Sequence, residues 1–255
     1  MLLQRNLASS KKCSAHFTEP LTKSVFDKGV NCMPNDNTTP MLAKEYDVKI
    51  NQTIPYYSEF YRQTLDVIEQ CGFDEIYWLD LGCGTGTLEE QAFQKFPAVH
   101  FVLVDPSEKM LEQAKFKLEN RSVKFVCAMS DSVQYENCFD VVTAIQSHHY
   151  MREQKRKKAT ECVYHALKKG GIYINFENIV SEDEDIKAFE LLRWGRYQQR
   201  HGKTAEEALE HNARCGKNYF PLTMAQHIQL LKDTGFRKVH IFWSSYMQMG
   251  IYGIK

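Results

Sequence analysis

Short apolar runs recur along the middle of the chain, at residues 76–81, 99–104, 123–126, 139–145 and 171–176. Longer stretches with helical spacing separate most of these runs. Short, continuous apolar runs that alternate with helices are typical of buried parallel strands. Because connections between parallel strands are right-handed, the pattern predicts a doubly wound α/β sheet with helices on both faces.

Helical patterns flank this alternation on both sides. Residues 41–72 precede it, and Pro55 suits the first turn of a second helix there. Residues 182–234 interrupt it with helical patterns only, before two last apolar runs at 239–243 and 246–254. The last run follows so closely that we expect it to return antiparallel.

The first part of the chain has a different character. Residues 1–40 are polar and are broken by proline and glycine, so they predict a loosely ordered segment. We expect one domain at residues 41–255, with helical cap elements at 41–72 and 182–234. Residues 1–18 are basic and lack an acid, which is compatible with an organelle-targeting peptide. A frayed N-terminus of a bacterial protein is the preferred interpretation.

Composition narrows the function classes. The chain has 255 residues with 32 Lys and Arg against 32 Asp and Glu, so it lacks the basic surplus of nucleic-acid-binding proteins. The basic run at residues 155–158 is interpreted as a solvated helix face. None of the eight cysteines forms a C-x-x-C pair or a zinc-type spacing, which predicts no metal site and favours a reducing, cytoplasmic location. No apolar run has the length of a membrane span, so no membrane association is expected.

The most informative segment is Leu79–Leu88, which reads LDLGCGTGTL. A predicted strand enters a G-x-G-x-G turn, and a predicted helix follows. Glycines there permit a tight turn and let a ligand approach the backbone. The next predicted strand ends at Asp105, where a carboxylate can accept hydrogen bonds from two ribose hydroxyls. Together these features predict a nucleoside-containing cofactor.

The spacing distinguishes two classes of cofactor. A dinucleotide fingerprint has a third glycine at the position that Thr87 occupies here. The segment instead resembles motif I of the class I S-adenosylmethionine-dependent methyltransferases, and Asp105 resembles their ribose-binding acid. Residues 139–144 (FDVVTA) and 166–171 (ALKKGG) resemble the fourth strand of that family and the turn before its fifth.

This resemblance spans residues 76–254 and implies a seven-stranded, mostly parallel Rossmann-like sheet whose last strand is antiparallel. It also implies S-adenosyl-L-methionine as cofactor and S-adenosyl-L-homocysteine as product. Ala128 and Met129 are expected to read the adenine, and Gln146 to lie at the methionine end. The expected cofactor-binding residues are Tyr57, Asp80, Gly82, Cys83, Gly84, Asp105, Pro106, Ala128, Met129 and Gln146.

The turn after the fourth strand reads Gln146-Ser147-His148-His149-Tyr150. An imidazole titrates near neutrality, so His149 is the candidate catalytic base, with plain packing as the competing interpretation. His148 is a candidate substrate-binding residue.

The flanking segments resemble one branch of this class, the carboxy-S-adenosylmethionine synthase family. Residues 53–57 (TIPYY) resemble its S-I-P-G-Y entry, and residues 211–223 resemble its K-R…L-T segment. In that family the arginine holds the extra carboxylate of the cofactor, and Arg214 falls on it. The glycine turn departs from the resemblance, because that family has GCSLG where this chain has GCGTG.

The sequence therefore predicts a soluble methyltransferase that acts on a small, carboxylate-bearing molecule, with His148, Arg214 and Tyr219 as substrate-binding residues. The alternatives are a carboxy-S-adenosylmethionine synthase-like enzyme, an RNA methyltransferase and a non-catalytic cofactor-binding module. A nucleic-acid partner is disfavoured by the charge balance. By analogy with the synthase family, we expect a homodimer.

Overall fold

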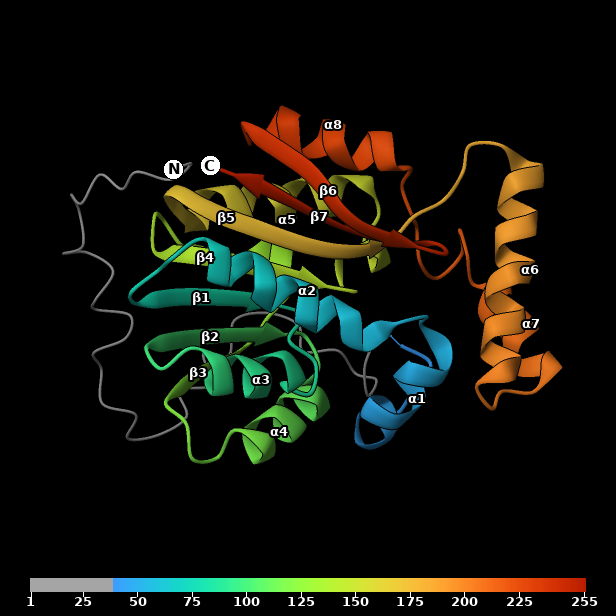
Figure 1. Cartoon of the computed structure of the whole chain (residues 1–255), viewed down its shortest axis with the longest axis horizontal. Coiled ribbons are helices and arrows are strands. Elements are labelled where there is room, and N and C mark those ends of the chain that lie inside the picture. The colour runs from blue at the N-terminus through green and yellow to red at the C-terminus, as the bar shows by residue number, and fades with distance from the viewer. Residues whose placement is uncertain (1–38) are drawn as a thin grey trace.

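The computed structural model describes residues 39–255, which form one seven-stranded sheet with helices on both faces (Figure 1). The predictions for residues 1–38 lie outside the described residues. The strand order is β3-β2-β1-β4-β5-β7-β6. The strands are β1 Ile76–Leu81, β2 Val99–Asp105, β3 Val123–Cys127, β4 Phe139–Ile145, β5 Leu167–Asn178, β6 Lys238–Ser245 and β7 Gln248–Ile254.

The helices separate the strands as the pattern predicts. The 3-10 helices are η2 Ala43–Glu45, η3 Ser130–Ser132 and η4 His148–Tyr150. The α-helices are α1 Tyr46–Thr53, α2 Tyr57–Gln70, α3 Thr87–Lys95, α4 Glu108–Lys117, α5 Glu153–Ala166, α6 Glu184–Arg200, α7 Ala205–Ala213 and α8 Met224–Thr234. Among the described residues, no helix combines the length and the apolar character needed to cross a membrane.

Strand pairing confirms the predicted fold class. Strands β1 to β5 pair in parallel, whereas β7 is antiparallel to both β5 and β6. The chain runs outward from β1 through β2 to β3 and then returns to place β4 on the other side of β1. In such a sheet a crevice opens at the carboxyl ends of β1 and β4, which is where α/β proteins bind ligands.

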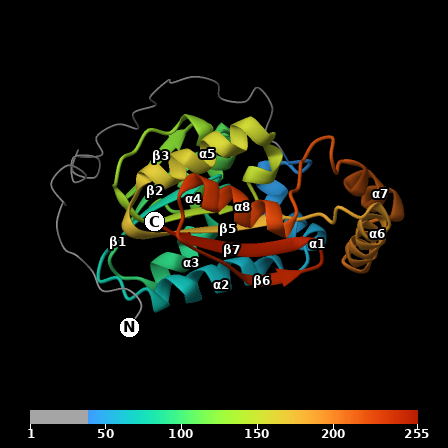
Figure 2. The same ribbon diagram turned by 90° about the horizontal axis from the view of Figure 1, so that it is seen from above.

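Alternating strand residues separate two cores, one on each face of the sheet. Trp78, Phe101 and Ile174 pack with apolar residues of α2, α3 and α4. Leu79, Val102 and Tyr173 pack with residues of α5 and α8 on the opposite face. Figure 2 shows α5 and α8 on one side of the sheet and α2 and α3 on the other. Burial on both faces explains why these strands are continuous apolar runs.

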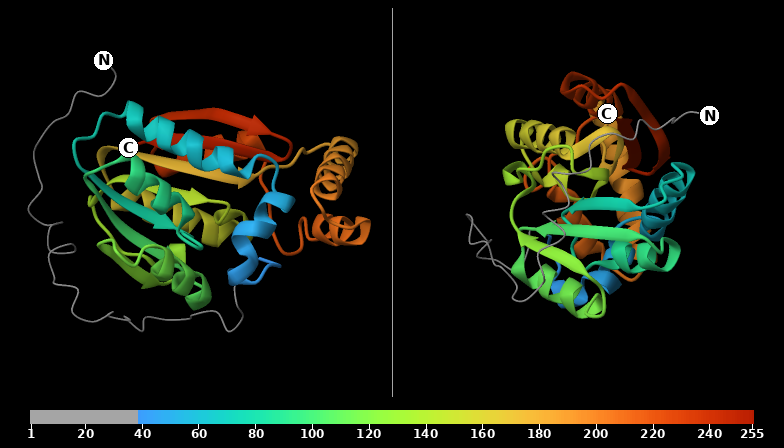
Figure 3. Two further views of the ribbon diagram at one scale, coloured as in Figure 1. Left: turned by 60° about the horizontal axis from the view of Figure 1, so that its bottom comes forward. Right: turned by 90° about the vertical axis from the view of Figure 1, so that its left-hand side faces the viewer.

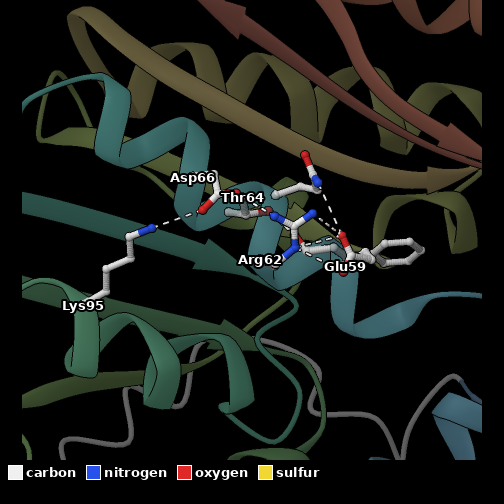
Figure 4. A network of polar contacts seen from close by, with 7 residues as sticks. Glu59, Arg62, Thr64, Asp66 and Lys95 are labelled. Carbon is white, nitrogen blue, oxygen red and sulfur yellow. Dashed lines mark hydrogen bonds and ion pairs between the residues drawn. The ribbon is translucent and has the colours of Figure 1, made fainter.

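Helix α2 illustrates how packing sets position. Its Phe60 is fully buried and stacks on Phe176 of β5, with ring centroids 4.6 Å apart. On its outer face Arg62 pairs with Glu59 and Asp66, and Lys95 of α3 reaches Asp66 (Figure 4). Exposed ion pairs contribute only about 0–1 kcal/mol each, so the buried aromatic contact determines where α2 lies.

Helices α6 and α7 lie beyond the end of the sheet, next to α1, in the views of Figures 1 and 3. The indole nitrogen of Trp194 on α6 donates a 2.6 Å hydrogen bond to the carbonyl oxygen of Thr53, which holds α6 on α1. Helix α8 differs from them, because it packs on α5 and β6 within the helix layer of the sheet. Within residues 182–234, only α6 and α7 therefore lie apart from the sheet and from the helices that cover it.

Candidate functional site

A cavity of about 1230 Å³ opens at the carboxyl ends of the central strands. Its walls come from the glycine turn after β1, the turns after β2 and β4, and the N-terminal helices. Ala128 is the one predicted cofactor-binding residue that does not line it. The nine that do are Tyr57, Asp80, Gly82, Cys83, Gly84, Asp105, Pro106, Met129 and Gln146.

The glycine turn is shaped by two different requirements. Gly82 has φ +82°, and a Cβ atom there would lie 2.4 Å from Cβ of Ser147. The hydroxyl of Ser147 donates to the carbonyl oxygen of Leu81, so the turn after β4 rests directly on the glycine turn. Gly84 has φ +55°, and a Cβ there would meet nothing within 4 Å. Its open side leaves room for a ligand to approach the backbone.

Asp105 is held at the end of β2 by backbone donors. Its Oδ2 accepts a 3.0 Å hydrogen bond from N–H of Gly84, and its Oδ1 accepts a 2.8 Å bond from N–H of Ser107. Burial raises the pKa of Asp105 to about 6, although these two donors act in the opposite direction. The carboxylate is therefore ionised at neutral pH, and each oxygen keeps a free lone pair for a ribose hydroxyl.

A second buried carboxylate lies at the base of the turn. Asp80 accepts a short hydrogen bond from the hydroxyl of Thr143, which itself accepts from the indole of Trp78 at 2.7 Å. Burial, together with the negative charge of Asp80, raises the pKa of the Glu89 carboxyl well above its usual range. This shift favours the neutral acid at Glu89, and a neutral acid beside Asp80 carries less charge than two carboxylates would.

Three tyrosines from the N-terminal helices form one wall of the cavity. The Tyr57 hydroxyl lies 3.3 Å from that of Tyr46 and accepts a 2.9 Å hydrogen bond from that of Tyr61. Burial raises the pKa of all three phenols, so they remain neutral donors. Of these three, sequence reasoning named only Tyr57 as a cofactor-binding residue. The four-residue spacing of Tyr57 and Tyr61 on one helix was the signal for Tyr61.

Gln146 combines strain with an unsatisfied donor. It has φ +55°, in the left-handed region that few residues other than glycine adopt. Its side-chain nitrogen is buried and has no hydrogen-bond partner among the described residues. Strained backbone and unpaired buried donors both occur at binding sites, where a ligand supplies the missing acceptor. The residues of the cavity therefore fit a polar, nucleoside-containing ligand.

A second, much smaller cavity of about 20 Å³ adjoins the first. Residues Thr39, Tyr46, Gln146 and Tyr150 line both cavities. The volume is enough for about one small group such as a carboxylate. Three of the four residues predicted for catalysis or substrate binding line this small cavity, namely His149, Arg214 and Tyr219.

His148 is the exception, and its imidazole lines neither cavity. Its Nδ1 lies 3.2 Å from the hydroxyl of Tyr173 on β5, and only 1% of the residue is exposed. Burial lowers the pKa of His148 to about 4, so its ring is neutral. Adjacent residues of a single turn point in different directions, which places His148 in the core and His149 at the cavity.

The His149 imidazole is paired with a residue that sequence reasoning missed. Its Nδ1 lies 3.1 Å from Oε2 of Glu177 on β5, and both side chains are buried. Oε1 of Glu177 accepts a hydrogen bond from the backbone N–H of His148 at 3.0 Å. The only available signal was a glutamate directly after the predicted apolar run 171–176.

Arg156 corrects the interpretation of residues 155–158 as a solvated helix face. Lys155, Lys157 and Lys158 are exposed, but Arg156 is 3% exposed and points inward from α5. Its guanidinium donates to the carbonyl oxygens of His148 at 3.1 Å and Met151 at 3.0 Å, and also to that of Phe220. Helical spacing explains this, because Arg156 shares the inner face of α5 with Ala159, Thr160 and Val163.

A polar cluster ties α1 to the glycine turn. Lys117 of α4 lies 2.8 Å from Oδ2 of Asp47, and the Thr85 hydroxyl donates a 2.5 Å hydrogen bond to Oδ1 of the same carboxylate. Burial acts to raise the pKa of Asp47, but the hydrogen bonds from Lys117 and Thr85 outweigh it and lower the pKa. This cluster, which sequence reasoning also missed, holds the N-terminal helices over the cavity.

Comparison with known proteins agrees with this geometry. A family model described as a methyltransferase domain matches residues 79–171. The carboxy-S-adenosyl-L-methionine synthase of Nautilia profundicola is 24% identical over 208 residues, which cover 80% of this chain and 89% of the relative.

Solved structures show the same fold. A Thermotoga maritima S-adenosylmethionine-dependent methyltransferase, 18% identical, aligns with a TM-score of 0.56 over 83% of this chain and 94% of its own. The phosphoethanolamine N-methyltransferase 2 of Haemonchus contortus, in complex with S-adenosyl-L-methionine, is 18% identical and aligns with a TM-score of 0.53 over 76% of this chain and 52% of its own. The chain thus has the class I S-adenosylmethionine-dependent methyltransferase fold and is a transferase that uses S-adenosylmethionine.

Proposed function

We propose that this protein transfers a methyl group from S-adenosylmethionine to a small molecule whose carboxylate binds Arg214. One observation carries the proposal: the small cavity that contains Arg214 adjoins the large one at Gln146 and Tyr150. An acceptor whose carboxylate lies in the small cavity would therefore extend toward the methionine end of a cofactor in the large one.

Residues of the large cavity divide the task of holding the cofactor. Asp105 is suited to the ribose hydroxyls, and Met129 and Pro106 to the adenine ring. Gly84 leaves the space beside its Cα open to the methionine part, where the unpaired amide nitrogen of Gln146 can donate. The bound cofactor supplies a methyl group on a positively charged sulfur, which is already activated for transfer. The protein then contributes mainly alignment of the two reactants.

The small cavity suits an anionic group with a compact body. Arg214 offers a planar fork of donors that matches the two oxygens of a carboxylate. Burial raises the pKa of Tyr150, while the charge of Arg214 and a hydrogen bond from it act in the opposite direction, so the two side chains are neighbours. The apolar side chains of Met41, Ile50 and Ile54 complete the walls.

A carboxy-S-adenosylmethionine synthase-like reaction is the second candidate. The relatives that carry this name match about four-fifths of the chain. The resemblance of residues 211–223 to a segment of that family places Arg214 on its carboxylate-binding arginine. Against it, the glycine turn has the methyltransferase form at Gly84. Native mass spectrometry separates the two, because the carboxylated cofactor is heavier by one carboxyl group.

A cytoplasmic location also belongs to the proposal. Among the described residues, Cys71, Cys83, Cys127, Cys138, Cys162 and Cys215 are free thiols. Free thiols persist most readily in a reducing compartment.

The decisive test of this function is a transfer assay with radiolabelled S-adenosylmethionine and a panel of small carboxylic acids and their amides. We expect transfer to an acid but not to its amide, and a loss of about 10- to 10²-fold in kcat/KM for Arg214→Ala, since a charge-assisted bidentate contact contributes about 1.5–3 kcal/mol. Arg200→Ala, at an exposed site on α6, is the matched control and should keep full activity. Equal use of acid and amide would disprove the role of Arg214.

A further inference from the structure

We infer that Glu177 is a positioning residue that fixes the imidazole of His149 with its proton on Nδ1, so that Nε2 accepts a proton from the methyl acceptor. The acceptor atom must then carry a proton, as it does in hydroxy and amino carboxylates. The inference rests on the proposed function and narrows it, because thioether and other proton-free acceptors are excluded.

The direction of the hydrogen bond follows from the partner. A carboxylate only accepts, so the ring nitrogen that faces Glu177 at 3.1 Å is the one that carries the proton. In the neutral ring the other nitrogen, Nε2, then has a free lone pair. No described residue is hydrogen-bonded to this Nε2, and His149 lines the small cavity beside Arg214 and Tyr219. The free lone pair is thus available to a molecule in that cavity.

Glu177 is held rigidly and remains ionised. It is completely buried, and its other oxygen is occupied by the backbone N–H of His148. Burial acts to raise the pKa of Glu177, but the hydrogen bond from His149 acts in the opposite direction, and the pKa is lowered. A buried anion that accepts two hydrogen bonds can orient an imidazole without losing its own charge.

The remaining groups around His149 do not compete for its proton. Burial lowers the pKa of His211 to about 3 and that of His227 to about 4, so both are neutral, like His148. Arg156 donates to backbone carbonyl oxygens, including that of His149. The titratable or charged groups around His149 are Glu177 of β5, His148 and Tyr150 of η4, Arg156 of α5, His211 of α7, Arg214 and Tyr219 after α7, and His227 of α8.

The proton and electron balance is complete without another reactant. A lone pair of the acceptor oxygen or nitrogen forms the new bond to the methyl carbon. The carbon–sulfur bond breaks, and its electron pair stays on the sulfur, which becomes neutral. The O–H or N–H proton of the acceptor passes to Nε2 of His149, where Glu177 stabilises the imidazolium. The proton leaves to solvent after the product dissociates.

The tautomer can be measured on the protein without any acceptor. Nitrogen-15 NMR of histidine-labelled protein above pH 8 reports which ring nitrogen carries the proton, and His149→Gln assigns the signal. We expect His149 as the Nδ1–H form in the wild type. In Glu177→Gln we expect that preference to be lost, because the amide can donate to Nδ1. Glu136→Gln, which alters the exposed His165–Glu136 pair, is the matched control and should leave His149 unchanged. A dominant Nε2–H form in the wild type would overturn the inference.

Transfer assays then test the acceptor class. Matched probes are 3-hydroxybenzoate, 3-aminobenzoate and 3-(methylthio)benzoate, with glycolate, glycine and (methylthio)acetate as the smaller series. We expect transfer only to the hydroxy or amino acids, and a fall in kcat of about 10²–10⁴-fold in Glu177→Gln. The affinity for S-adenosylmethionine should stay unchanged, since Glu177 does not line the large cavity. Equal transfer to the thioether would refute the inference. If NMR finds the predicted tautomer of His149 but no probe is methylated, that result would count against the proposed function and not against the role of Glu177.

Discussion

Replacement of Asp105 by asparagine should weaken cofactor binding by about 10²–10⁴-fold. Two ribose hydroxyls donate to the carboxylate, and each hydrogen bond to a charged group contributes about 1.5–3 kcal/mol, which gives about 3–6 kcal/mol in total. Asparagine keeps the size of the side chain but turns one acceptor oxygen into a donor. That donor would face N–H of Gly84, which now donates to Oδ2.

The same residue predicts a pH dependence of a definite sign. Because burial raises the pKa of Asp105 to about 6, lowering the pH through 6 neutralises the group that binds the ribose. Affinity should therefore fall by about tenfold between pH 7.5 and pH 5, following the ionised fraction.

Isothermal titration calorimetry with S-adenosylmethionine at pH 5.0, 6.0 and 7.5 measures both the loss of affinity in the variant and the pH dependence of the affinity. Asp105→Asn should bind weakly and with no step near pH 6. Asp66→Asn, on the outer face of α2 (Figure 4), should behave as wild type. A variant that binds within about threefold of wild type would refute the ribose assignment.

Two further predictions concern the frame of the site. Arg156→Met should lower the free energy of unfolding by about 3 kcal/mol or more in urea titration, because the carbonyl oxygens it satisfies stay buried; a loss under 1 kcal/mol would contradict this role. Gly82→Ala should abolish cofactor binding, since its Cβ would lie 2.4 Å from that of Ser147. Adding Ser147→Gly to this variant should restore part of the cofactor binding, measured by calorimetry. No recovery would mean that the positive φ of residue 82 alone causes the defect.

Much of the cofactor cavity was predictable from sequence because its determinants are local. Gly82, Gly84 and Asp105 each follow an apolar strand, and neighbouring parallel strands bring their carboxyl ends to one edge of a sheet. The alternation of strands and helices therefore places them together without any knowledge of packing. The antiparallel return of β7 was predictable for the same reason, since a short connection permits little else.

The small cavity was decided by tertiary structure. Its residues come from separate segments that share no periodic pattern, as the pairs His149–Glu177 and Arg214–Tyr150 show. Only the packing of α1, α7 and β5 brings these residues together. Sequence could not separate His148 from His149, because side chains in a single irregular turn follow their surroundings. In helices and strands the direction of the side chains repeats with a fixed period, so the sequence shows which residues share a face. Side chains in turns and contacts between distant segments follow no such period, and only the packing of the folded core sets them.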